Sequence, residues 1–227
     1  MMSEQQGKRL VRGLSRVLLG TVLLVSLLLT SSYAQADENQ VFFRAGGAFA
    51  ESDRAGEVFT DVFGAAGSQT GSDDGSYIGA GVELLLSKDV LGFLPGASLL
   101  GEIGIEYKDF GAKNVAQAVP TVATGEVFMK DVQVSMLTVD IAPKIKFMQG
   151  SRLRPWVIPI GLDFHVISPP SNSTTYLDVG VQFGAGLEYR VWKALNIGVD
   201  ARYHAASGQT STVNNYSTIG VYTGLSF

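Results

Sequence analysis

Residues 177–190 read LDVGVQFGAGLEYR, and the alternation in this stretch decides the fold. Every second residue is apolar: Leu177, Val179, Val181, Phe183, Ala185, Leu187 and Tyr189. The residues between them are polar, charged or glycine. Because side chains point alternately to the two faces of a strand, the stretch predicts a β-strand with one apolar face and one polar face.

The same alternation recurs along the chain, for example in residues 99–107 and 195–204. It predicts eight strands, at residues 40–50, 76–88, 97–109, 128–148, 154–166, 175–190, 194–204 and 216–227. Three connections are short, at 89–96, 149–153 and 191–193. Four are mostly longer and rich in Gly, Ser, Thr and Asn, at 51–75, 110–127, 167–174 and 205–215. Short turns at one end and long loops at the other are typical of bacterial outer-membrane barrels, in which the turns are periplasmic.

Aromatic residues fall near both ends of the predicted strands. The predicted periplasmic ends carry Phe43, Phe147, Trp156, Tyr189, Trp192 and Phe227. The predicted outer ends carry Tyr107, Phe110, Phe128, Phe164, Tyr176, Tyr203 and Tyr216. Membrane barrels place girdles of aromatic rings at both lipid–water interfaces, so these positions favour the membrane topology.

The apolar content is high but is not gathered into blocks. Hydrophobic residues make up 46% of the chain, yet after Ala36 no stretch approaches the roughly 18 consecutive apolar residues of a membrane helix. A soluble β-sandwich would also alternate, but its solvent face normally carries Lys, Glu and Thr. Here the second face is rich in glycine, which leaves room inside a tightly curved barrel. The pattern therefore favours an all-β, eight-stranded antiparallel transmembrane barrel.

The N-terminal 36 residues predict a cleaved signal peptide. A basic region of Lys8, Arg9, Arg12 and Arg16 precedes a nearly unbroken apolar run at 17–30. The sequence Ala34-Gln35-Ala36 then supplies the small-x-small cleavage pattern. The alternative is a membrane anchor, but the run is shorter than the roughly 20 residues that a spanning helix needs. We expect residues 1–36 to be the leader and residues 37–227 to form one barrel domain.

Charge and cysteine content exclude several classes of function. Cleavage would remove four of the 17 Lys and Arg residues and one of the 21 Asp and Glu residues, which leaves 13 against 20 and a net charge of −7. An acidic exported domain with no basic stripe is a poor nucleic-acid binder. The chain has no cysteine, so disulfides, thiolate metal sites and cysteine nucleophiles are excluded.

The C-terminal strand carries a family resemblance. Ile219, Val221, Thr223, Leu225 and Phe227 alternate with small or polar residues and end on a terminal aromatic. This ending looks like the signal read by the outer-membrane assembly machinery, with Tyr222, Leu225 and Phe227 as its residues. Together with FGAGLEYR at 183–190 and GVDARYH at 198–204, the chain resembles the eight-stranded OmpA-type, or porin-family, barrels of Gram-negative bacteria. The resemblance implies architecture and not function, because the family hosts unrelated roles. The sequence ends at Phe227, so we expect no peptidoglycan-binding domain.

The polar faces predict a charged barrel interior. The charged residues assigned inward are Arg44, Glu83, Glu102, Glu106, Lys108, Asp140, Lys144, Lys146, Asp163, Asp178, Glu188, Arg190, Asp200 and Arg202, with His165 and His204 on the same face. Eight acids beside six bases favour ion pairs across the lumen. An eight-stranded barrel is only just wide enough for side chains to fill. We expect a plugged interior; a narrow gated pore for small solutes is the alternative.

An enzyme is the less favoured alternative. Outer-membrane lipid A deacylases place a His and a Ser at a similar barrel mouth, with a carboxylate that orients the histidine. This chain has His204 and Ser207, but spaced His-Ala-Ala-Ser where that family shows His-x-Ser, and no acid follows Asp200. The sequence predicts no catalytic, cofactor-binding or metal-binding residue.

The function expected from the sequence is therefore a structural or surface-interaction barrel of the outer membrane. Its expected partners are outer-membrane lipid and lipopolysaccharide, the assembly machinery during biogenesis, and an extracellular ligand at loops 51–75 and 110–127.

Overall fold

The structure is a computed structural model that describes residues 38–51, 74–117, 128–168, 176–207 and 214–227. For residues 112–117, 128–134, 167, 168 and 176 it describes the backbone alone. The predicted leader lies outside the described residues, as do most of loop 51–75 and parts of the other three long loops. Within the described part of the chain, no helix has the length and hydropathy needed to cross a membrane.

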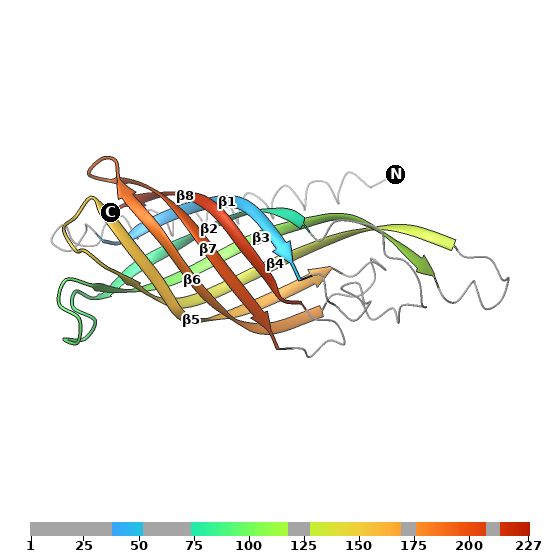
Figure 1. Ribbon diagram of the computed structural model, residues 1–227, viewed down its shortest axis with the longest axis horizontal. Coiled ribbons are helices and arrows are strands. Elements are labelled where there is room, and N and C mark those ends of the chain that lie inside the picture. The colour runs from blue at the N-terminus through green and yellow to red at the C-terminus, as the bar shows by residue number, and fades with distance from the viewer. Residues whose placement is uncertain (1–37, 52–73, 118–127, 169–175, 208–213) are drawn as a thin grey trace, which may run out of the picture. The chain divides into compact units, whose positions relative to one another are not determined.

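Eight strands form one closed antiparallel barrel (Figure 1), which confirms the predicted fold class. The strands are β1 (Gln40–Ala50), β2 (Asp74–Ser87), β3 (Ser98–Gln117), β4 (Phe128–Lys146), β5 (Leu153–Ser168), β6 (Tyr176–Arg190), β7 (Leu195–Ala206) and β8 (Tyr216–Ser226). Each strand pairs with its neighbour in sequence, and β8 closes the barrel on β1. Turns 88–97, 147–152 and 191–194 lie at one end, here called the turn end; the opposite end is called the loop end.

The β3–β4 hairpin is longer than the sequence predicted. β3 continues to Gln117, so the first half of the predicted loop 110–127 is strand. Residues 112–117 pair with 128–133 of β4. A register shift between Asp109 and Ala112, with Gly111 at φ 76°, separates this extension from the barrel wall. The extension escaped prediction because its residues do not alternate clearly, and because its regularity comes from pairing with β4.

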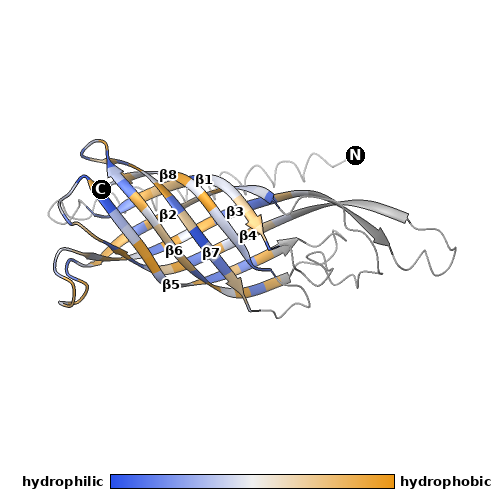
Figure 2. Cartoon of the chain, in the orientation of Figure 1, coloured by the Kyte–Doolittle hydropathy of each residue, from blue (hydrophilic) through white to orange (hydrophobic). Residues whose placement is uncertain are grey.

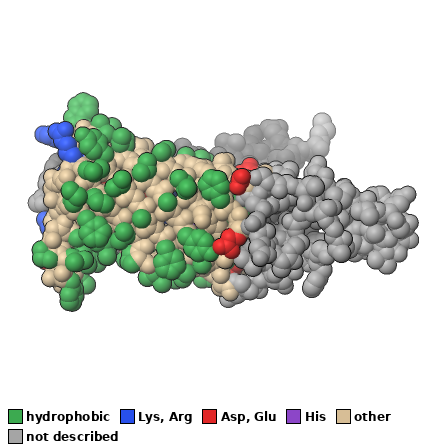
Figure 3. Space-filling view, viewed as in Figure 1, with side chains coloured by type: hydrophobic (Ala, Val, Ile, Leu, Met, Phe, Trp, Pro, Cys, Tyr) green, Lys and Arg blue, Asp and Glu red, His purple; other side chains and the backbone are tan. Residues whose placement is uncertain are grey.

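The two surfaces of the barrel wall have opposite polarity (Figure 2). Large apolar side chains point outward, such as Ile105, Leu162 and Val221 at 48%, 51% and 61% exposure. On the face that Figure 3 shows, hydrophobic side chains are spread over the barrel wall, with Lys and Arg side chains at the turn end and Asp and Glu side chains toward the loop end. An apolar outside and a polar inside are the arrangement of a barrel that spans lipid, because closure pairs every wall strand and hydrocarbon meets only apolar side chains.

For three of the predicted girdle aromatics the predicted position on the outer surface is wrong. Phe110, Trp156 and Tyr216 are buried in the barrel interior, at 2%, 1% and 0% exposure. They were assigned by their height along the strands, whereas the face on which a residue lies decides where its ring points. Five others do lie on the outside: Phe43, Tyr107, Tyr189, Trp192 and Tyr203.

The interior aromatics form two apolar clusters among the charges. Near the loop end the cluster is Ala48, Tyr77, Phe110, Met136 and Tyr216. Toward the turn end it is Phe42, Ala142, Trp156, Ile158 and Tyr222. Interior glycines make space for these rings: a β-carbon at Gly186 would overlap Trp156, and one at Gly198 would overlap Tyr222.

Candidate functional site

The candidate site is the barrel interior. The structure buries eleven of the twelve residues proposed for the lumen charge network: Arg44, Glu83, Glu102, Glu106, Asp140, Lys144, Asp163, Asp178, Glu188, Asp200 and Arg202. The twelfth, Arg190, is half-buried at the turn end of β6. Lys108, Lys146, His165 and His204 are buried as well.

Glu102 is the centre of this network. Its carboxylate accepts hydrogen bonds from Arg202 Nη1 at 2.6 Å, from Lys144 Nζ at 3.0 Å and from Arg44 Nη1 at 3.4 Å. These three cations come from β7, β4 and β1, whereas Glu102 lies on β3. Removing charges from water is costly, and the cost is offset only when opposite charges and hydrogen bonds surround them closely. Glu102 therefore joins strands from opposite sides of the lumen through buried ion pairs.

The two interior arginines extend the network around the barrel. Arg44 forms ion pairs with Glu106 and with Asp140, the latter at 3.0 Å. Arg202 binds Asp200 at 2.9 Å and donates to Gln182 Oε1 at 3.2 Å. A planar guanidinium can donate in several directions at once. Each arginine is thus held by groups on at least two strands.

The turn end of the lumen holds a lysine-rich layer. Lys146 binds Glu83 at 3.0 Å and Glu188 at 3.0 Å, and Lys144 binds Glu83 at 2.6 Å. The Gln40 amide donates to both of these glutamates, at 2.8 and 2.9 Å. Lys144 also lies 3.7 Å from the centre of the Trp156 ring. This cation–π contact helps to stabilise the Trp156 ring in the lumen.

The loop end holds the two histidines. His204 Nδ1 lies 2.7 Å from Asp163, and His165 Nδ1 lies 3.0 Å from the Thr138 hydroxyl. Lys108 donates to the same hydroxyl at 2.9 Å. The interior at this level is thus packed and polar.

His204 and Ser207, the pair behind the less favoured hydrolase alternative, are not hydrogen-bonded to each other among the described contacts. The Ser207 hydroxyl donates to Asp178 at 2.8 Å, and Asn214 Nδ2 donates to the same carboxylate at 2.9 Å. A serine nucleophile needs a base within hydrogen-bond reach, and here its hydrogen bond goes to a carboxylate instead. Asp163, on β5, was assigned to the lumen from the sequence, but its position beside His204 was not predicted.

Several polar residues of the interior were also missed. Gln40, Gln182 and Asn196 are buried: the first two bond to charged neighbours through their amides, and Asn196 donates to Gln40. Arg154 is buried and pairs with Glu38 at 3.1 Å. Gln40, Gln182 and Asn196 share the alternation of the charged residues on their strands, which could have located them. Arg154 does not, because a register shift between Ile158 and Gly161 reverses the alternation on β5.

The proposed C-terminal assembly residues do not share a face. Tyr222 points into the lumen, where its hydroxyl accepts a hydrogen bond from Trp156 Nε1 at 2.9 Å. Leu225 is 51% exposed on the outer surface, and Phe227 follows the last residue of β8. Their role in assembly stays a prediction.

No metal site is evident in the part of the chain that the structure describes, since no three His, Asp or Glu side chains there are grouped to hold an ion.

Comparison with known proteins identifies the fold but does not assign the chain to a family. No family model matches the sequence, and no curated protein matches it. Among solved structures, Neisserial surface protein A is similar at 14% identity and a TM-score of 0.52, over 83% of this chain and 97% of that one. The N-terminal β-barrel domain of Pseudomonas aeruginosa OprF matches at 14% identity, TM-score 0.44, over 85% and 100%. The outer membrane enzyme PagL matches at 13% identity, TM-score 0.46, over 82% and 98%.

The likeness to Neisserial surface protein A confirms the architecture inferred from the sequence. This chain has the fold of the eight-stranded outer-membrane barrels. The fold and the apolar outer surface together confirm the predicted location in a bacterial outer membrane.

Proposed function

We propose that this protein is a structural and surface-interaction barrel of the outer membrane whose lumen does not conduct. The observation that carries the proposal is the convergence of Arg44, Lys144 and Arg202 on Glu102, with all four side chains buried across the lumen. A protein that acts through its membrane-facing and external surfaces needs a rigid wall, and this network supplies the rigidity.

The width of the barrel supports a closed lumen. An eight-stranded barrel has an interior just wide enough for side chains. Here that interior holds the ion-pair network and two aromatic clusters. A hydrated ion could pass only if several buried pairs separated together, and each separation would leave an uncompensated buried charge.

A narrow channel is the second candidate, and one observation favours it. The Tyr77 hydroxyl, Gln182 Nε2 and the Thr218 hydroxyl are buried with no hydrogen-bond partner in the described part of the chain. Buried polar groups of this kind ordinarily bind water. A file of water along β2, β6 and β8 would give small solutes a path beside the charges.

Conductance in planar bilayers separates the two candidates. The closed barrel should give no single-channel steps across a range of voltages, with a known porin as the positive control. The variant Glu102→Ala should give steps, because it removes the group that holds three cations in place. Steps from the unmodified protein whose ion selectivity changes in Arg202→Glu would instead establish a channel.

The surface-interaction part of the proposal has its own test. Loop 51–75, most of which lies outside the described residues, is the first region to shorten. Shortening should abolish binding of an external ligand while the barrel still folds, as judged by a gel shift between unboiled and boiled samples. Retained binding would assign the ligand to another surface.

A further inference from the structure

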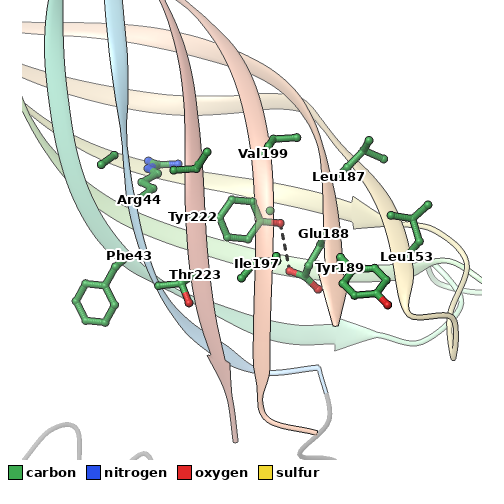
Figure 4. A pocket seen from close by; sticks show the side chains of 13 residues that line it. Phe43, Arg44, Leu153, Leu187, Glu188, Tyr189, Ile197, Val199, Tyr222 and Thr223 are labelled. Atoms are coloured by element: carbon green, nitrogen blue, oxygen red, sulfur yellow. Dashed lines mark hydrogen bonds between the residues drawn. The ribbon is translucent and has the colours of Figure 1, made fainter. Parts of the chain in front are cut away.

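A shallow apolar trough of about 610 Å³ lies on the outer surface, in the half of the barrel nearest the turn end (Figure 4). Short outward side chains form its floor: Ala45, Ile197, Val199, Val221 and Thr223. Taller side chains form its walls: Leu153, Leu187 and Tyr189 on one side and Phe43 on the other.

The register of the sheet produces the trough. Tyr189 pairs with Ile197, Ile197 with Thr223, and Thr223 with Phe43, so these side chains form one row across four strands. The short members occupy the middle of the row and the two rings its ends. Neighbouring strands lie about 4.8 Å apart, which puts the two rings roughly 14 Å from each other. Arg44, Glu188 and Tyr222 turn their side chains away from the trough, and Figure 4 shows the hydrogen bond between the last two.

Two exposed cations lie beside the trough at the turn end. Arg152 directly precedes the wall residue Leu153, and Lys193 lies in the turn between β6 and β7. The backbone N–H of Arg190 donates to the carbonyl of Arg152 at 2.8 Å, which holds the two turns side by side. Trp192, in the same turn as Lys193, is 75% exposed, and exposed aromatic rings are common where a membrane protein meets lipid headgroups.

We propose that the trough binds an acyl chain of an anionic phospholipid, with Arg152 and Lys193 contacting its phosphate. The trough faces the hydrocarbon of the membrane, so an acyl chain fits its lining. The cations lie at the polar end of the same surface, where the headgroup of that lipid would lie. On the face that Figure 3 shows, Lys and Arg side chains lie at this end of the barrel and Asp and Glu side chains lie toward the other. The local charge therefore favours an anionic lipid in the leaflet at the turn end. The site lies outside the lumen, and it stands whether or not the lumen conducts.

Native mass spectrometry of the folded full chain in detergent tests the proposal. The protein is titrated with phosphatidylglycerol and with phosphatidylcholine of the same acyl chains. We expect tighter retention of phosphatidylglycerol. Arg152→Gln and Lys193→Gln should each weaken it about fivefold, the effect of one cation near a lipid surface. Ala45→Phe, which fills the floor, should weaken retention of both lipids.

Matched controls keep the result specific. Lys88→Gln removes an exposed cation from the turn between β2 and β3, away from the trough. Ala201→Phe adds the same ring to the outer face of β7 beyond the lining. Both should bind like the unmodified protein. Equal retention of the two lipids by the unmodified protein, or an equal loss in Lys88→Gln, would overturn the proposal. A dimer peak that Ala45→Phe abolishes would also overturn it, by making the trough an interface between two copies.

Discussion

The ring of His204 stacks on the ring of Tyr216, with the centroids 4.3 Å apart and the planes at 14°. Both side chains are buried, and Asp163 lies 2.7 Å from Nδ1 at the edge of the imidazole. The stack helps to hold the His204 side chain inside the lumen, whereas Ser207 lies just beyond the loop end of β7. In this structure His204 contacts the Tyr216 ring and Asp163, and its other nitrogen, Nε2, has no hydrogen-bond partner among the described residues.

Ser207 is expected to have no catalytic role. Expression of the unmodified protein and of Ser207→Ala in a suitable host should leave the mass spectrum of lipid A identical to that of an empty-vector control. The substitution should lower the free energy of unfolding by about 0.5–1.5 kcal/mol, because Asp178 loses the hydrogen bond from Ser207. Loss of an acyl chain from lipid A with the unmodified protein, restored by Ser207→Ala, would establish a hydrolase.

Among the interior charges, removal of the Glu102 carboxylate is expected to lower the free energy of unfolding the most. Glu102→Ala should lower the free energy of unfolding by about 3–5 kcal/mol, because it leaves buried cations uncompensated. Urea unfolding in detergent, followed by the gel shift of the folded form, measures this loss. Lys88→Ala, an exposed charge at the turn end, is the control and should change stability by less than about 0.5 kcal/mol. Equal effects of the two substitutions would mean that the interior pairs contribute nothing to the barrel.

Replacing an interior glycine by a larger residue should lower the stability of the barrel. Gly198→Ala should destabilise the barrel by about 1–3 kcal/mol, because its β-carbon would overlap the ring of Tyr222. Gly101→Ala is the matched control. Its β-carbon would lie 3.4 Å from the flexible end of Leu86, an ordinary contact. The difference between their unfolding midpoints measures how tightly the lumen is packed, and no difference would point to a looser, hydrated interior.

Glu38 should make the turn end sensitive to acid. Burial raises the pKa of its carboxyl, but the hydrogen bond from Ser98 and the charge of Arg154 outweigh burial and hold the pKa below its usual value of 4.5. Because the folded pKa is depressed, the stabilisation is present above the unfolded pKa and is lost as the pH falls from about 4.5 through the folded value. The stability difference between the unmodified protein and Glu38→Gln should therefore shrink below pH 4.5. A constant difference across that range would show that Glu38 is not coupled to Arg154.

Some of the interior could be predicted because alternation is a local property. The eight strands, the apolar outer face and the buried charges follow from which residues recur at every second position. The extension of β3 could not be predicted in this way, because residues 112–117 owe their strand geometry to β4. Trp156 and His165 could not both be placed either. Simple alternation along β5 would put these two residues on opposite faces, because one has an even number and the other an odd number. Both point inward, because a register shift between Ile158 and Gly161 reverses the alternation.

The sequence by itself determined the architecture: an alternating pattern puts apolar side chains on one face of every strand, and lipid is the surround that such a surface requires. Only the tertiary structure decided the partners. Glu102 meets Arg44, Lys144 and Arg202 because closing the barrel brings β1, β4 and β7 around β3 at matching heights. Asp163 reaches His204 for the same reason. The face of a residue depends on its own strand, whereas its partners across the lumen depend on the stagger of all eight strands, which no single segment carries.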